Sequence, residues 1–207
     1  MALAPAAAEI LAAVAPAVIF KAAVMNRTNS TSAPRRLGFF ARLQRVLRHR
    51  WMDDGDTRRA VPPELLKRLE NYVNASESRH TGEVRICVEA GMPSSYLWRG
   101  ATPRERAIAM FGKLRVWDTE HNNGVLIYLL LAEHAIELVA DRGLNAKVSA
   151  TQWQAITQRL SAALKAQKFE DGLTQALQEV SALLVQHYPL QEGQVRSNGL
   201  PNAPDIR

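Results

Sequence analysis

The feature that most constrains the fold is a run of seven consecutive apolar residues at 125–131, which follows Asn122-Asn123-Gly124. A run this short, bounded by turn residues and lacking alternation, is typical of a β-strand that is covered on both faces. We therefore expect a strand at the centre of a sheet, with helices packed on both sides of the sheet.

Two further strands are expected beside this one. Residues 83–89 alternate between polar and apolar side chains, which predicts a half-buried strand toward an edge of the sheet. A capping box formed by Thr102 and Glu105 starts a helix between this strand and the apolar run, so the two strands should be parallel. Residues 135–140 follow the apolar run after a short turn and predict an antiparallel hairpin strand.

Helical periodicity also predicts a helix after Pro63 and two helices between 149 and 188. The expected fold class is α/β: a three-layer α/β/α sandwich with a small mixed β-sheet, made of a parallel strand pair plus an antiparallel hairpin strand. This domain should cover 62–189, and 190–207 should be a disordered tail. Cys87 is the single cysteine, so an intramolecular disulfide is excluded, and we expect it to be an unreactive structural thiol.

The first third of the chain differs in composition from the rest. Residues 1–62 carry 10 Lys and Arg against 4 Asp and Glu, which accounts for the whole formal net charge of +6. The predicted domain is therefore electrically balanced, and we expect no nucleic-acid partner. Residues 1–34 are rich in alanine and should form a disordered extension, with an atypical export signal as the alternative. A cytoplasmic location is the default expectation.

Residues 35–61 form a basic amphipathic lead-in to the domain. Apolar residues at 39–51 recur at helical spacing, with arginines between them. Such a helix can fold back onto its own domain, or it can make a peripheral membrane contact through 35–51, which would make the protein membrane-associated. The aspartates and arginines at 53–59 should form a solvated loop.

Polar side chains gather in three loops that the strand directions should bring to one end of the sheet. Because the first two strands start there and the third strand ends there, these loops should be neighbours. The candidate binding cluster consists of His80, Glu83, Asp118, His121, Asn122, Asn123, Asp141 and Arg142.

Three interpretations of this cluster remain open. Glu83, Asp118 and Asp141 carry hard oxygen ligands that could hold a divalent cation, the one cofactor that the sequence suggests. Alternatively, Arg142 and the loop amides could hold a phosphate, with His121 as the proton donor. In the third interpretation these are turn residues without a binding role. No known catalytic motif is present, so catalytic residues stay unassigned.

Four segments carry a resemblance to a known family. They are Gly82-Glu83-Val84-Arg85-Ile86, Asn122-Asn123-Gly124-Val125-Leu126-Ile127, Asp141-Arg142-Gly143-Leu144 and Phe169-Glu170-Asp171-Gly172-Leu173. In this order and spacing, over about residues 64–188, the chain resembles the soluble bacterial branch of the TPM domain family.

The resemblance implies work in membrane-protein maintenance, phosphatase activity in some relatives, and a LemA-type membrane protein as partner. Where the family's usual pattern is Asp-Asn-Gly, this chain has Asn122, so the acid best suited to metal or phosphoryl chemistry is missing. We therefore expect a non-catalytic or weakly catalytic accessory in membrane-protein or envelope maintenance that acts through protein contacts. The alternative is a phosphatase or divalent-metal-dependent phosphohydrolase that uses the loop cluster.

Overall fold

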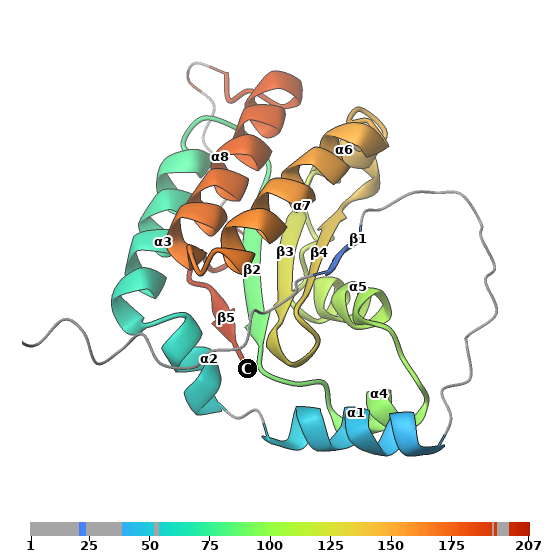
Figure 1. Ribbon diagram of the computed structural model, residues 1–207. Coiled ribbons are helices and arrows are strands. Elements are labelled where there is room, and N and C mark those ends of the chain that lie inside the picture. The colour runs from blue at the N-terminus through green and yellow to red at the C-terminus, as the bar shows by residue number, and fades with distance from the viewer. Residues whose placement is uncertain (1–20, 24–38, 52–53, 192, 194–198) are drawn as a thin grey trace, which may run out of the picture.

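The computed structural model describes residues 21–23, 39–51, 54–191, 193 and 199–207. Among them, five strands form one sheet in the order β1-β4-β3-β2-β5 (Figure 1). The strands are β1 Lys21–Ala23, β2 Val84–Glu89, β3 Val125–Leu130, β4 Ala135–Ala140 and β5 Asp205–Ile206. β3 lies in the middle and all of its residues are buried, as the apolar run predicts.

The directions of the strands fix which loops are neighbours. β2 is parallel to β3, with Val84 opposite Val125, and β4 is antiparallel to β3, with Ala140 opposite Val125. The start of β2, the start of β3 and the end of β4 therefore lie at the same end of the sheet, in agreement with the prediction.

One face of the sheet is covered by α3 (Pro63–Glu77), α7 (Ala150–Lys165) and α8 (Phe169–His187) (Figure 1). Their inward residues and the sheet residues beneath them form one apolar core. The buried helix residues of this core include Leu65, Leu69, Val73, Trp153, Ile156, Leu160, Leu173, Leu177 and Leu184. Hydrophobic burial holds this layer on the sheet, and the buried Glu77 of α3 adds a hydrogen bond, since its Oε1 accepts the N–H of Val84 (3.1 Å).

The other face is covered mainly by α5 (Pro103–Lys113), with α4 (Ser94–Trp98) and α1 (Phe39–Trp51) toward one end of the sheet. The inward residues of α5 and of the sheet form a second apolar cluster. α5 begins at the predicted capping box, in which Thr102 and Glu105 bond to each other's backbone N–H groups. With helices on both faces, the fold is the predicted α/β/α sandwich.

The C-terminal tail corrects the expectation that 190–207 is disordered. Its residues 199–207 run beside β2, where β5 pairs with β2 in parallel. The N–H group of Arg207 donates to the carbonyl of Val88 (2.9 Å), and Leu200 is buried. The edge of β2 offers unpaired backbone groups and Leu200 offers an apolar contact, so the tail is fixed despite its polar composition.

β2 is consequently an interior strand, which corrects the expected half-buried strand. All of its residues are buried, with Val84, Ile86 and Val88 in the core beneath α3 and α8, and Cys87 in the cluster beneath α5. The polar residues of the alternating pattern therefore lie inside the protein, where each needs a partner.

Short helices replace two of the expected loops. α2 (Asp54–Ala60) lies where a solvated loop was expected, and α6 (Arg142–Asn145) follows β4. α6 forms because the side chain of Asp141 accepts a hydrogen bond from the N–H of Arg142 and so caps the helix. A 3-10 turn, η1 (Leu131–Glu133), joins β3 to β4.

The N-terminal extension departs from the expectation of disorder at one place. β1, at Lys21–Ala23, lies within 1–34 and pairs in parallel with β4. The rest of 1–34, including the segment considered as an export signal, lies outside the described residues. None of the described helices combines the length and the apolar character that crossing a membrane requires.

Removing residues 199–207 should lower the free energy of unfolding by about 3 kcal/mol, because it exposes the edge of β2 and the surface that Leu200 covers. Leu200→Ala alone should account for about 2 kcal/mol of this loss. Urea unfolding of the full and truncated chains measures the difference. A truncated chain as stable as the full chain would argue against a packed tail.

Candidate functional site

The three loops that were predicted to meet are neighbours in the structure. We call them the loop rim, which comprises residues 80–83, 121–124 and 141–143. The N–H group of Val125 donates to the carbonyl of Glu83 (2.9 Å), and the N–H group of Asp141 donates to the carbonyl of Gly124 (2.8 Å). The sheet ladder therefore continues into the rim and holds the loops in register.

Asn122 holds the second loop of the rim against the third. Its backbone has a φ of 52°, a left-handed conformation that asparagine tolerates. Its Oδ1 accepts a hydrogen bond from Arg142 Nε (3.2 Å), and its carbonyl accepts one from the N–H of Leu144 (3.3 Å). Gly143 permits this approach, since a Cβ there would lie 2.6 Å from the carbonyl oxygens of His121 and Asn122.

Asn123 connects the second loop to the first. Its side chain is fully buried, and its Nδ2 donates to Thr81 Oγ1 (3.2 Å). Its N–H group donates to Thr119 Oγ1 (3.0 Å). At Gly124 a Cβ would lie 1.9 Å from the carbonyl oxygen of Val116, so a larger residue does not fit. The Asn-Asn-Gly segment thus makes the contacts that hold the loops together.

Asp141 uses only part of its carboxylate in capping α6. Its Oδ1 accepts the N–H of Arg142 (2.7 Å), whereas its Oδ2 is buried and accepts no hydrogen bond from any described residue. Oδ1 of Asn123 is likewise buried and has no donor within the described part of the chain. Buried oxygens without a donor are uncommon, so these two atoms are where the rim could accept a proton donor or a cation.

The two histidines of the predicted cluster lie in different surroundings. His80 is buried, and its Nδ1 donates to the carbonyl of Gly82 (3.0 Å), inside the first loop. His121 is exposed and meets the ring of Tyr188 edge-on, with the ring centroids 6.4 Å apart. His121 is therefore the histidine that a ligand at the rim surface could reach.

The three carboxylates expected to hold a cation are not brought together as ligands. Asp118 pairs with Arg115 on the surface, and Oε1 of Glu83 accepts the N–H of Gly199 in the tail (2.8 Å). Asp141 caps α6. Among the residues that the structure describes, no group of three His, Cys, Asp or Glu side chains is placed to hold a metal ion.

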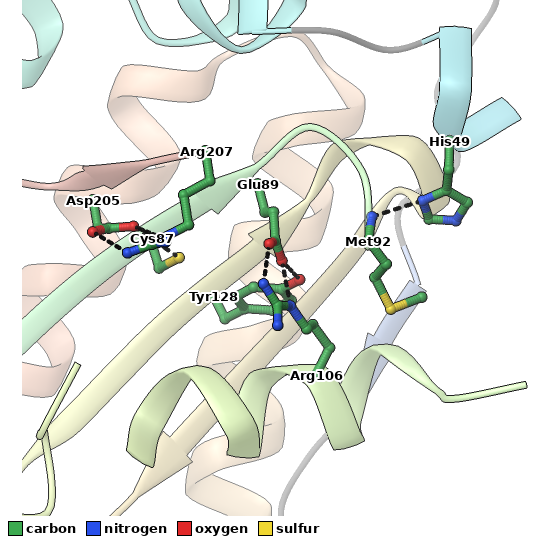
Figure 2. A network of polar contacts seen from close by, with 8 residues as sticks. All are labelled: His49, Cys87, Glu89, Met92, Arg106, Tyr128, Asp205 and Arg207. Atoms are coloured by element: carbon green, nitrogen blue, oxygen red, sulfur yellow. Dashed lines mark hydrogen bonds and ion pairs between the residues drawn. The ribbon is translucent and has the colours of Figure 1, made fainter. Parts of the chain in front are cut away.

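A second polar cluster lies between α5 and the sheet (Figure 2), and we call its members, Glu89, Arg106 and Tyr128, the buried ion network. Arg106 donates from Nε to Glu89 Oε2 (2.9 Å) and from Nη2 to Glu89 Oε1. Tyr128 donates its hydroxyl to Glu89 Oε2 (2.6 Å). All three side chains are buried, so the charges of Glu89 and Arg106 compensate each other away from water.

The surroundings of Tyr128 and Arg106 keep both of these side chains protonated. Burial raises the pKa of Tyr128 and the carboxylate of Glu89 raises it further, so the phenol keeps the proton that it donates. Burial alone would lower the pKa of Arg106, but its hydrogen bonds to Glu89 raise it. The guanidinium of Arg106 also lies 4.7 Å from the ring centroid of Tyr96. These contacts suit a structural connection between α5 and the sheet.

The buried ion network is not evident from the patterns of the sequence. Alternation at 83–89 predicts that Glu89 faces solvent, and Arg106 resembles an ordinary surface residue of α5. Tyr128 is the one available indication, because it is the only residue of the apolar run with a polar group, and a buried hydroxyl needs a partner.

Cys87 lies near this network and has the properties of the expected structural thiol (Figure 2). Its Sγ lies 3.9 Å from Asp205 Oδ1, and the same aspartate pairs with Arg207 in the tail. Burial raises the pKa of Cys87, so its reactive thiolate does not form at neutral pH.

α1 is bound to the domain by hydrogen bonds at the end of the sheet opposite the loop rim. The N–H of Met92 donates to His49 Nδ1 (2.9 Å), and His49 Nε2 lies 2.9 Å from Glu133 Oε1. Arg45 donates from Nε to Glu133 (2.6 Å) and from Nη2 to the carbonyl of Ala101 (2.6 Å). Burial would raise the pKa of Glu133, but the hydrogen bonds from His49 and Arg45 lower it. The lead-in helix thus folds onto its own domain, through the polar side chains of Arg45 and His49 and through Val46, which packs against the second apolar cluster.

Glu89→Gln should lower the free energy of unfolding by about 3 kcal/mol, because it leaves the charge of Arg106 buried without a counter-charge. Tyr128→Phe should lower it by about 1 kcal/mol, since one hydrogen bond is lost. Asp118→Asn is the control, because it breaks a surface pair with Arg115 and should have little effect. Urea unfolding of the three variants tests this order, and equal effects of Glu89→Gln and Asp118→Asn would be incompatible with it.

Comparisons with known proteins agree with this architecture. The profile of the TPM domain matches residues 56–183. Among solved structures, the NMR structure of BA42 protein from the psychrophilic bacterium Bizionia argentinensis has a TM-score of 0.61 and 23% sequence identity, covering 70% of this chain and 94% of that chain. At this identity the likeness shows a shared fold. A comparison with curated proteins gave no match. Because the family profile spans more than half of its length, the chain belongs to the TPM domain family.

Proposed function

We propose that this TPM domain protein is a non-catalytic accessory that binds a protein partner in membrane-protein or envelope maintenance. The supporting observation is that the side chains of Asn122 and Asn123 join the loops of the rim, while the side chain of Asp141 caps α6. Asn122 is neutral, and its Oδ1 already accepts a hydrogen bond from Arg142. It therefore cannot replace the aspartate of the family's usual Asp-Asn-Gly pattern as an acid, a base or a charged ligand.

The outer surface of the rim suits contact with an acidic protein surface. Arg142 and His121 are exposed there, and Lys147 Nζ lies 4.0 Å from the ring centroid of Tyr188. Arginine and aromatic side chains are enriched in the centres of protein interfaces, and paired opposite charges steer association. The partner that we propose is a LemA-type membrane protein, which the resemblance to bacterial family members suggests.

The alternative function is a phosphatase or divalent-metal-dependent phosphohydrolase. One observation favours it: the buried Oδ2 of Asp141 and Oδ1 of Asn123 accept no hydrogen bond from the described residues. Both are hard oxygen ligands of the kind that magnesium and calcium prefer. A phosphate beside them would have to compete with Asn122 for the guanidinium of Arg142.

Binding of the full chain to the immobilised soluble domain of a LemA-type protein tests the proposal. Arg142→Glu with Lys147→Glu should weaken this binding by about tenfold or more, because Arg142 belongs to the rim and Lys147 lies over Tyr188, which contacts His121 of the rim. Lys113→Glu with Lys165→Glu makes the same charge change at exposed sites on α5 and α7 and should bind like the wild type. Absence of wild-type binding, or equal loss in both pairs, would refute the rim as the binding surface.

Hydrolysis of p-nitrophenyl phosphate with added magnesium, manganese or calcium distinguishes the two functions. A non-catalytic rim predicts the same background turnover in the wild type and in Asp141→Asn. Cation-dependent turnover that is abolished in Asp141→Asn, but kept in Asp118→Asn, would establish the phosphatase instead.

A further inference from the structure

One face of α1 is apolar and exposed. The side chains of Phe40, Leu43, Leu47 and Trp51 are 82%, 45%, 44% and 79% exposed, and we call them the α1 stripe. At about 100° per residue, the four positions fall within an arc of about 80° on the helix. The stripe is about 16 Å long at 1.5 Å rise per residue. Large apolar side chains gathered on one exposed face are typical of an interaction surface.

The contacts of α1 with the domain explain why this stripe faces outward. Arg45 and His49 lie on the opposite side of the helix and bind Glu133, and His49 also accepts the N–H of Met92. Turning the stripe inward would break these contacts and leave the buried His49 and the carboxylate of Glu133 without partners. The domain therefore fixes the helix with its apolar face outward.

Charge complements the apolar face. Arg48 and Arg50 are exposed and lie on either side of the stripe, about 100° and about 60° from its centre line at Leu47. α1 contains no Asp or Glu between Phe39 and Trp51. An apolar stripe bordered by arginines matches a surface that is negatively charged outside and apolar just beneath.

We propose that the α1 stripe docks on the surface of an anionic phospholipid bilayer. An exposed helix face of this kind can lie flat in the headgroup region with its apolar side chains inserted. The aromatic residues Phe40 and Trp51 lie at its two ends, and tryptophan favours the boundary between headgroups and acyl chains. In Figure 1, α1 forms the outer margin of the molecule beside α4, where Trp98 is also exposed (64%).

This surface lies at the opposite end of the sheet from the loop rim, so the inference does not depend on a partner binding at the rim. Docking through α1 would leave the rim directed away from the bilayer and open to a protein.

Sedimentation of the full chain with vesicles tests the proposal. Wild-type protein should bind vesicles of phosphatidylglycerol and phosphatidylcholine in equal parts, more weakly at high salt, and should bind phosphatidylcholine vesicles far less. Leu47→Glu with Trp51→Glu should lower binding by about tenfold or more. Ile108→Glu with Trp117→Glu, a matched change at two exposed apolar residues elsewhere, should bind like the wild type.

A second pair of variants tests the charge contribution. Arg48→Gln with Arg50→Gln keeps the stripe, and it should weaken binding to the anionic vesicles and reduce its dependence on salt. Absence of wild-type binding to anionic vesicles at low salt would overturn the proposal, as would equal loss in the stripe variant and its matched control. If gel filtration instead shows a dimer that Leu47→Glu with Trp51→Glu converts to a monomer, without vesicle binding by the wild type, the stripe is covered by a second copy and the proposal is wrong.

Discussion

The complete burial of β3 is the constraint on which the rest of the structure depends. An apolar strand of this kind needs a strand on each side and helices on both faces, and the fold supplies all of them. The two ends of β3 then define the two ends of the molecule. Its start lies between β2 and β4, so the loop rim forms there. Its end leads into η1, which presents Glu133 to α1.

The two layers of helices are held on this sheet by different means. α3, α7 and α8 contact it through an apolar core, to which Glu77 of α3 adds one hydrogen bond, whereas α5 is also joined to it by the charged side chains of the buried ion network. A buried ion pair adds little net stability, because removing the charges from water offsets much of their attraction. Its directional hydrogen bonds nevertheless specify one position of α5. The layer of α3, α7 and α8 supplies most of the stability. The buried ion network fixes the position of α5 on β2 and β3.

The local elements of this fold were predictable because each has a short-range cause. The apolar run at 125–131 indicates a central strand, the capping box at Thr102 starts α5, and the order of strands brings the loops of the rim together. The tail was not predictable, because Leu200 and Ile206 are isolated apolar residues in a polar segment and the tail pairs with the distant edge of β2. A polar residue that becomes buried on folding follows the same sequence pattern as a polar surface residue. The burial of Glu89 was therefore not predictable.

The same limit applies to α1. Its amphipathic pattern suggests that the apolar face packs inward. In the structure Arg45 and His49 bind Glu133, which is more than eighty residues away in the chain. Val46 packs against the domain, whereas the α1 stripe faces outward. The rim is an intermediate case: the topology places Asn122, Asn123 and Asp141 at one end of the sheet, yet only the structure shows that they bond to neighbouring loops.

We infer that the rim residues hold loops together and do not form a catalytic cation site. Backbone amide NMR spectra of the full chain, recorded during titration with magnesium and with calcium, test this claim most directly. A rim closed by its own side chains predicts that the amide signals of Gly124 and Arg142 do not change in a saturable way. Saturable changes confined to these and neighbouring rim amides would contradict it.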